Sequence, residues 1–137
     1  MSGYWNSEVS GLDKDNWFMT GDIARIDETG NIFIVDRKKD MIIVSGFNVF
    51  PNEVEAVVNE HPAVLECGCV GVEGKDSQEL VKVFIVLHDD QTLSEEEIIT
   101  FCRDKLTAYK VPKQIEFIKE IPKTNVGKVL RRELKEN

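Results

Sequence analysis

Cysteine is scarce in this sequence, and no long apolar run is present. The three cysteines among 137 residues are Cys67, Cys69 and Cys102, and each has apolar neighbours. An odd number of such cysteines predicts reduced thiols in a hydrophobic core and argues against a disulfide framework. A zinc site would need His61 or His88 to join a C-x-C pair, which matches known ligand spacings weakly, so we predict no metal site. Every apolar run falls short of the roughly 20 residues that cross a bilayer, so we predict no transmembrane segment.

Positive charge is also in the minority. The chain has 17 Lys and Arg against 25 Asp and Glu, which gives a net charge of -8. The resulting field repels polyanions, so we expect no nucleic-acid partner and no electrostatic attachment to anionic lipid. The first residues lack the basic start and apolar block of a secretory signal, and a cytoplasmic location is therefore expected.

The composition is otherwise that of a globular domain. Hydrophobic residues make up 42% of the chain and charged residues 31%. Short β-rich runs predict strands at 23–27, 31–36, 41–44, 64–72, 80–87 and 114–121. In the last of these, alternation predicts that Ile115, Phe117 and Ile121 are buried. The segment Ser45-Gly46-Phe47-Asn48 predicts a turn.

Three helices are expected between and after these strands. The first opens at Pro51, because proline is favoured in the first helical turn. Ser94 followed by Glu97 has the spacing of a capping box and marks the start of the second. Leu130 and Leu134 share one face of a short third helix. This order predicts an α+β fold class, in which helices pack on a small mixed or antiparallel sheet after a β-hairpin.

Three polar clusters lie where the periodicity breaks, and loops between rigid elements often carry function. They are residues 20–22, 36–46 and 122–128. In this order they resemble the adenylate-forming superfamily of acyl-CoA synthetases, luciferases and peptide-synthetase adenylation domains. The matching segments cover essentially the whole chain: GYWN, WFMTGDIA, GNIFIVDRKKDMIIVSGFNVFPNEVE, YKVPK and PKTNVGKVLRREL. The run DRKKDMIIVSGFNVFPNEVE resembles bacterial long-chain fatty acid:CoA ligases in particular.

The resemblance implies two domains. Residues 1–38 would be the tail end of the large nucleotide-binding domain, with its Thr-Gly-Asp motif and a β-hairpin, and residues 39–137 the mobile C-terminal domain. The Ser/Thr/Gly-rich phosphate loop and the acyl pocket of the family belong to the large domain and have no match in this sequence. The chain by itself is therefore expected to be inactive.

Two residues match the family's contacts to the ATP ribose. Asp22 matches the aspartate of the Thr-Gly-Asp motif, and its two acceptor oxygens suit a vicinal diol. Arg37 matches the arginine that contacts the ribose and reaches toward phosphate. The alternative for Asp22 is an ordinary turn aspartate, and the alternative for Arg37 is a solvated run of charged residues.

The family also implies a hinge and a path for CoA. Lys39 matches the hinge residue, where a long charged side chain lets the small domain swing with little loss of packing. Ser45, Gly46 and Phe47 match the loop along which the pantetheine of CoA passes, where a glycine leaves room beside the backbone. An ordinary left-handed turn glycine is the alternative.

Lys128 matches the lysine that promotes adenylation. A carboxylate that attacks the α-phosphate brings two anions together, which costs about 4 kcal/mol at roughly 4 Å and an effective dielectric near 20. A lysine between them offsets much of this repulsion. The alternative is an exposed surface lysine. A Walker loop is not indicated, because Val129 follows where Ser or Thr is required.

The resemblance therefore implies an ATP-dependent long-chain fatty acid:CoA ligase that uses ATP, Mg²⁺ and CoA. Its partners would be the fatty acid, these substrates and its own large N-terminal domain, and the resemblance leaves open a peripheral association with the inner face of the cell membrane. One alternative is an adenylation domain with another acyl acceptor, such as a carrier-protein thiol. A free-standing binding module is a second.

Overall fold

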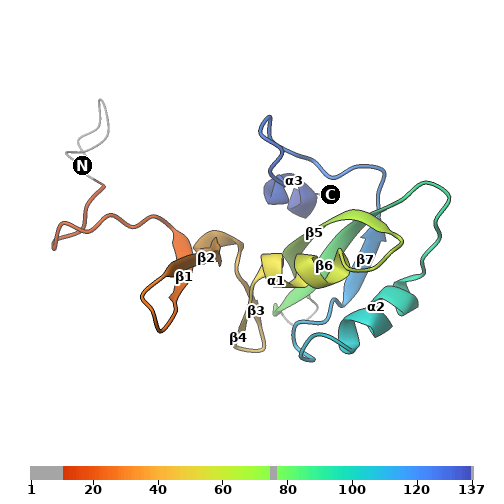
Figure 1. The fold of residues 1–137 in the computed structure, drawn as a ribbon, viewed down its shortest axis with the longest axis horizontal. Coiled ribbons are helices and arrows are strands. Elements are labelled where there is room, and N and C mark those ends of the chain that lie inside the picture. The colour runs from red at the N-terminus through yellow and green to blue at the C-terminus, as the bar shows by residue number, and fades with distance from the viewer. Residues whose placement is uncertain (1–10, 75–76, 137) are drawn as a thin grey trace. The chain divides into compact units, whose positions relative to one another are not determined.

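The computed structural model describes residues 11–74 and 77–136 (Figure 1). The chain divides into two compact units, Met1–Lys39 and Asp40–Asn137. The boundary between them therefore directly follows Lys39, the residue expected to be the hinge. Each unit is described by itself below.

The first unit contains the predicted β-hairpin. Strands β1 (Asp22–Ile26) and β2 (Ile32–Arg37) pair antiparallel, with a bulge after Ile23. The Asp27 carboxylate closes the loop, because it accepts hydrogen bonds from the backbone N–H groups of Thr29 and Asn31 at 2.9 Å each. One apolar stripe of the hairpin is open to solvent, with side chains 67–69% exposed at Ile26, Ile32 and Ile34.

The second unit begins with a small hairpin that the sequence did not fully predict. After the short 3-10 helix Lys38–Asp40, strands β3 (Ile42–Val44) and β4 (Phe47–Val49) pair antiparallel. The predicted four-residue turn is wrong for Phe47 and Asn48, which already lie in β4. Only Ser45 and Gly46 form the turn, with φ of 50° and 84°. Two positive φ values allow a two-residue loop whose twist matches the strands.

The remaining elements form a three-stranded mixed sheet with helices on both faces. Strand β5 (Val64–Glu73) pairs antiparallel with β6 (Glu79–Leu87), and β6 pairs parallel with β7 (Gln114–Phe117). The strand order β5-β6-β7 leaves β5 and β7 at the edges. The helices are α1 (Pro51–Val58), α2 (Glu95–Arg103) and α3 (Arg131–Glu136). The predicted α+β class and mixed sheet are confirmed.

The second helix begins as its capping box predicts. The Glu97 backbone N–H donates to Ser94 Oγ at 3.2 Å, and the Ser94 backbone N–H donates to Glu97 Oε2 at 2.9 Å. The two bonds satisfy donors that would otherwise lack a partner at the helix start. The bonds from the Ser94 backbone and hydroxyl lower the pKa of the Glu97 carboxyl.

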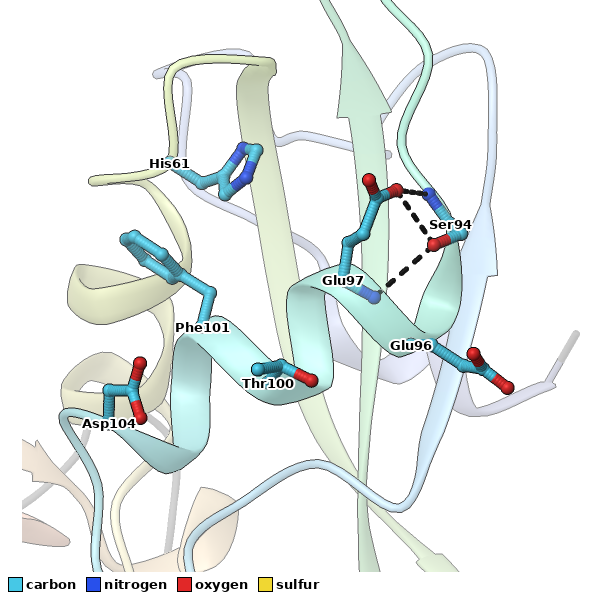
Figure 2. A pocket seen from close by; sticks show the side chains of 7 residues that line it. All are labelled: His61, Ser94, Glu96, Glu97, Thr100, Phe101 and Asp104. Carbon is cyan, nitrogen blue, oxygen red and sulfur yellow. Dashed lines mark hydrogen bonds between the residues drawn. The ribbon is translucent and has the colours of Figure 1, made fainter.

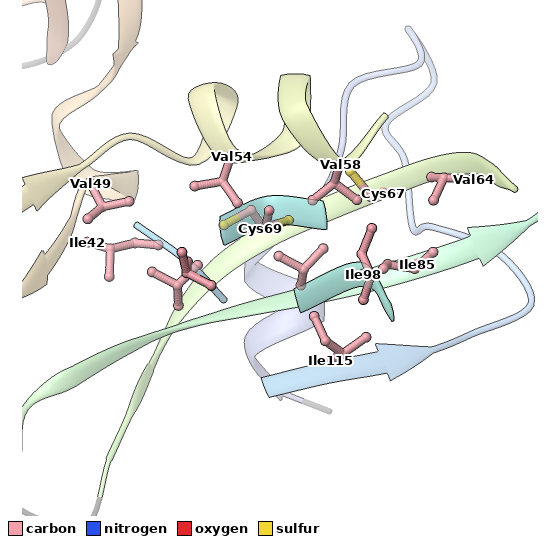
Figure 3. Packing of buried hydrophobic residues seen from close by; sticks show 14 of the residues in the cluster. Ile42, Val49, Val54, Val58, Val64, Cys67, Cys69, Ile85, Ile98 and Ile115 are labelled. Carbon is pink, nitrogen blue, oxygen red and sulfur yellow. The ribbon is translucent and has the colours of Figure 1, made fainter. Parts of the chain in front are cut away.

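The main core lies between the sheet and the helices α1 and α2 (Figure 3). Its buried side chains include Ile42, Val49, Val54, Val58, Val83, Ile85, Ile98 and Ile115. The prediction of buried, reduced cysteines is confirmed, since Cys67, Cys69 and Cys102 are all buried and free. Burial raises the pKa of the Cys102 thiol to about 11 and raises that of Cys67 as well.

A smaller core covers the opposite face of the sheet, because successive side chains of a strand point to opposite faces. It joins Leu134 of α3 to Phe84 and Ile121. Ile121 packs here, whereas Ile115 packs in the main core, so the chain changes faces after β7. The prediction that Phe117 is buried is therefore wrong. It lies at the end of an edge strand, where the chain crosses over, and is 38% exposed.

Candidate functional site

The hairpin of the first unit brings the two predicted ribose contacts together. Asp22 opens β1 and stands opposite Arg37, the last residue of β2. Arg37 Nε lies 3.1 Å from Asp22 Oδ1, and the two side chains are 55% and 34% exposed. The Asp22 backbone N–H donates to Thr20 Oγ1 at 3.1 Å. The carboxylate is thus held in place while remaining accessible to a ligand.

An open hollow of about 450 Å³ adjoins this pair. It is lined by Gly21, Arg37, Lys38 and Lys39. Gly21 has φ of 77°, and its carbonyl accepts the Lys38 backbone N–H at 2.7 Å, which ties the Thr-Gly-Asp turn to the end of β2. Three basic side chains around one hollow suit an anionic group such as phosphate.

The turn between β3 and β4 carries the residues expected to face CoA. Gly46 adopts a φ of 84°, which glycine accepts without strain. A Cβ at this position would meet no atom within 4 Å, so the outer side of the turn is open. Gly46 is therefore a left-handed turn glycine, and the space beside it is open. The structure is compatible with both interpretations, a turn glycine and a path for CoA.

Two residues that were not predicted as site residues, Tyr109 and Glu79, support this turn and the strand before it. The ring of Phe47, which is 55% exposed, stacks on Tyr109 with centroids 4.7 Å apart and an interplanar angle of 19°. The carboxylate of Glu79 accepts the Ile43 backbone N–H at 2.6 Å. Both come from distant parts of the chain, and no local pattern in the sequence signals either contact.

Lys128 lies in a tight turn that precedes α3. The Thr124 backbone N–H donates to the Lys128 carbonyl at 2.8 Å, and the Lys128 backbone N–H donates to Thr124 Oγ1 at 3.1 Å. Gly127 completes the turn with a φ of 79°. Lys128 is exposed, and Val126 beside it is 78% exposed. The loop therefore has an ordered backbone and presents its side chains outward.

The structure does not gather all predicted site residues at one place. Asp22 and Arg37 meet in the first unit. Within the second unit, the β3-β4 turn and the loop that leads into α3 lie at opposite ends (Figure 1).

A second hollow, of about 660 Å³, lies along α2 (Figure 2). Its lining is acidic and was not predicted, and includes His61, Glu96, Phe101 and Asp104. The His61 ring meets the Phe101 ring edge-on at 5.0 Å, and His61 Nδ1 accepts the Ala63 backbone N–H at 3.2 Å. These contacts and the capping box serve the start of the helix and the turn before β5. They indicate a structural role.

Neither a metal-binding cluster nor a membrane-spanning helix is present in the part of the chain that the structure describes. There, no three His, Cys, Asp or Glu side chains lie close enough together to hold a metal ion. None of the helices in residues 11–74 and 77–136 is long and apolar enough to cross a membrane.

The fold is that of the C-terminal domain of adenylate-forming enzymes. Residues 53–128 match the AMP-binding enzyme C-terminal domain, and the chain belongs to that family. The chain is 56% identical to a long-chain-fatty-acid–CoA ligase of Escherichia coli O6:H1, over 99% of the chain and 24% of the relative. A ligase with the same name from Bacillus subtilis is 47% identical over 99% of the chain and 25% of its own length. The chain thus spans about a quarter of the length of the curated relatives it matches.

Solved structures agree with this assignment. ATP-bound MatB from Rhodopseudomonas palustris is 34% identical, with a TM-score of 0.90 over 98% of this chain and 27% of that one. The o-succinylbenzoate CoA synthetase MenE from Bacillus subtilis, in complex with its acyl-adenylate intermediate, is also 34% identical. Its TM-score is 0.88 over 100% of this chain and 28% of that one.

Proposed function

We propose that this chain is the carboxy-terminal part of an ATP-dependent long-chain fatty acid:CoA ligase. The enzyme joins ATP and a fatty acid to give an acyl-adenylate and pyrophosphate, and CoA then displaces AMP to give the thioester. The observation that carries the proposal is the 56% identity to a ligase of that name over 99% of the chain. The exposed Lys128 on an ordered turn adds a chemical reason.

In the first step, Lys128 neutralises charge between the fatty acid carboxylate and the α-phosphate. The ammonium group is compact, and the flexible side chain allows it to reach the reacting oxygens. Asp22 accepts hydrogen bonds from the ribose hydroxyls. Its ion pair with Arg37, at 3.1 Å, supports this role because it orients the carboxylate before ATP arrives.

In the second step, the Ser45-Gly46-Phe47 segment borders the path of the CoA thiol. The open space beside Gly46 and the exposed ring of Phe47 support this role. Because this turn and the Lys128 loop lie at opposite ends of the second unit, we infer that the unit rotates between the two steps. Lys39, at the boundary of the compact units, is the proposed hinge.

The domain assignment and partners are part of the same proposal. Residues 1–38 end the large nucleotide-binding domain, and residues 39–137 form the mobile domain that docks on it. The exposed apolar stripe of Ile26, Ile32 and Ile34 supports such a neighbour for the hairpin. Mg²⁺ enters with ATP, because the polyphosphate charge needs a divalent partner. We place the enzyme in the cytoplasm, in peripheral association with the inner face of the cell membrane.

Half-reaction assays on the longer protein that contains this chain test the proposal. With palmitate and ATP, we expect pyrophosphate release and an acyl-adenylate, followed by palmitoyl-CoA when CoA is added, detected by mass spectrometry. Transfer to a carrier-protein thiol in place of CoA would favour the alternative acceptor. Absence of pyrophosphate release with any fatty acid would contradict the adenylating function itself.

A further inference from the structure

A group of charged side chains in the second unit has no part in the function proposed above. Arg131, the first residue of α3, directs Nη2 to Glu55 Oε2 at 2.8 Å and to Asn52 Oδ1 at 2.7 Å. Its Nη1 lies 3.6 Å from Asp40 Oδ2. The side chains of Arg131, Glu55 and Asp40 are only 15%, 13% and 19% exposed. Arg131 Nε also donates to Glu55 Oε1, at 3.3 Å, so the contact with this carboxylate is forked. A forked contact that is largely shielded from solvent is stronger and more directional than a surface ion pair.

This ion-pair group joins elements on the two faces of the sheet. Glu55 belongs to α1, whose Val54 and Val58 pack in the main core, whereas α3 contributes Leu134 to the core on the opposite face. The two helices are linked across the edge strand β5, where Glu55 Oε1 also accepts the Cys69 backbone N–H at 2.8 Å. The ion pair therefore fixes the position of α3 relative to α1 and the edge of the sheet.

The same contact reaches the Lys128 loop. Arg131 follows Lys128 by three residues, and between them the Leu130 backbone N–H donates to the Pro122 carbonyl at 2.8 Å. Lys123 and Val129 form an antiparallel bridge that closes the base of the loop. The base of the loop thus leads directly into Arg131, which is bound to Glu55. A shift of Arg131 would therefore move Lys128.

The group also includes the residue next to the proposed hinge. Asp40 directly follows Lys39 and is the first residue of the second compact unit. Its contact with Arg131 is the longest of the group, at 3.6 Å, whereas the shortest contacts of Arg131 with Glu55 and Asn52 are 2.8 and 2.7 Å. A change of backbone torsion at Lys39 would alter this contact before the tighter ones.

For the reaction proposed above, we propose that Arg131 is a positioning residue for adenylation. It holds the Lys128 loop at a fixed place on α1 and the β5 edge, and its contact with Asp40 ties that loop to the hinge. Arg131 acts through Lys128, and the thioester step, which uses the β3-β4 turn, does not depend on it.

Single-turnover kinetics of the two half-reactions in the longer protein test this role. Arg131→Ala should slow acyl-adenylate formation by about tenfold to a hundredfold, because a small misplacement of a catalytic group has effects of that size. Thioester formation from preformed acyl-adenylate should stay close to the parent rate, as should KM for ATP. Glu55→Gln should have a smaller effect and Asp40→Asn the smallest.

Arg132→Ala is the matched control. Arg132 is the next residue on the same helix, but its side chain is 90% exposed and pairs only one turn further along α3, with Glu136. Both half-reactions should keep their parent rates in this variant. Arg131→Lys separates loss of positioning from loss of folding. The lysine keeps a positive charge beside Glu55 but cannot form the two-nitrogen contact that arginine makes with the carboxylate. This variant should keep the parent melting temperature and still slow adenylation.

Hydrogen exchange of the segment 122–130, followed by mass spectrometry, tests the positioning without any substrate. Exchange should be faster in Arg131→Ala and Arg131→Lys than in the parent, and unchanged in Arg132→Ala. If the parent forms no acyl-adenylate, the proposed function is wrong and this exchange alone decides the positioning role. Equal slowing of both half-reactions by Arg131→Lys, or unchanged exchange in both Arg131 variants, would overturn the inference.

Discussion

The ring of Phe47 lies on the ring of Tyr109, with centroids 4.7 Å apart and planes inclined by 19°. Phe47 stands directly after the turn expected to face CoA, and Tyr109 lies in the segment between α2 and β7. The stacked pair therefore ties the β3-β4 turn to the body of the second unit. Tyr109 is a candidate positioning residue for the second half-reaction.

Tyr109→Ala should slow thioester formation and leave adenylation near the parent rate. Stacked aromatic pairs contribute about 0.5–1.5 kcal/mol beyond their buried area, so we expect an effect of roughly twofold to tenfold. Tyr109→Phe keeps the ring and is the control, with both rates expected to be unchanged. Equal effects of the two variants would show that the hydroxyl, and not the stacking, is what matters.

Lys128→Ala should slow acyl-adenylate formation by orders of magnitude. The lysine offsets repulsion of about 4 kcal/mol between the two reacting anions, and each 1.36 kcal/mol is tenfold in rate. Thioester formation from synthetic acyl-adenylate should be nearly intact. Lys135→Ala, on the exposed side of α3, provides the control. A Lys128→Ala protein that loses both half-reactions equally, with an unchanged melting temperature, would contradict this division of labour.

Lys39→Pro and Gly46→Leu should both spare adenylation and impair thioester formation. Proline fixes φ at the proposed hinge and blocks the rotation between the two steps. Leucine at position 46 would place bulk in the space beside the turn, and the φ of 84° adds a backbone strain of about 1–2 kcal/mol. Gly46→Ala separates the two causes, because its Cβ would meet no atom within 4 Å. A large loss of the second step in Gly46→Ala would mean that strain alone is responsible.

Gly68→Ala should destabilise the second unit. A Cβ at this position of β5 would lie 2.6 Å from Leu134 Cδ1, so the buried Leu134 side chain would have to change its rotamer or α3 would have to shift. Overpacking of this kind typically costs about 1–3 kcal/mol, which urea denaturation of the 137-residue chain would detect. Leu134→Val in the same protein should recover part of the loss. A Gly68→Ala protein as stable as the parent would show that the Leu134 side chain can make room without loss of packing.

The Asp27 carboxyl should titrate well below its usual range. Hydrogen bonds from the Asn31 and Thr29 side chains, and then from the Asn31 backbone, lower its pKa from 3.8 to about 2. Because the folded pKa is lowered, the loop gains stability above pH 4 and loses it as the pH falls toward 2. A carboxyl-detected NMR titration measures this directly. Asn31→Ala should raise the pKa most and Thr29→Ala less, and no change in either variant would refute the assigned cause.

Features that depend on near neighbours could be predicted from the sequence. The β1-β2 hairpin closes over a few residues, and the capping box joins Ser94 to Glu97 within a single helical turn. Loose alternation of apolar residues placed β5, and a nearly continuous apolar run placed β6, because both faces of β6 are buried. The candidate residues Asp22, Arg37, Gly46 and Lys128 followed from the resemblance of their segments to motifs of the adenylate-forming superfamily.

Only the tertiary structure decided which distant side chains support those motifs. Arg131 and Glu55 are 76 residues apart, and their contact exists because α1 and α3 meet across the edge of β5. The stack of Tyr109 on Phe47 and the exposure of Phe117 likewise depend on how the chain crosses the sheet. Such contacts arise from packing between elements, and no local periodicity encodes them. The sequence by itself therefore determined most of the elements and the candidate chemistry, and the fold determined what holds that chemistry in place.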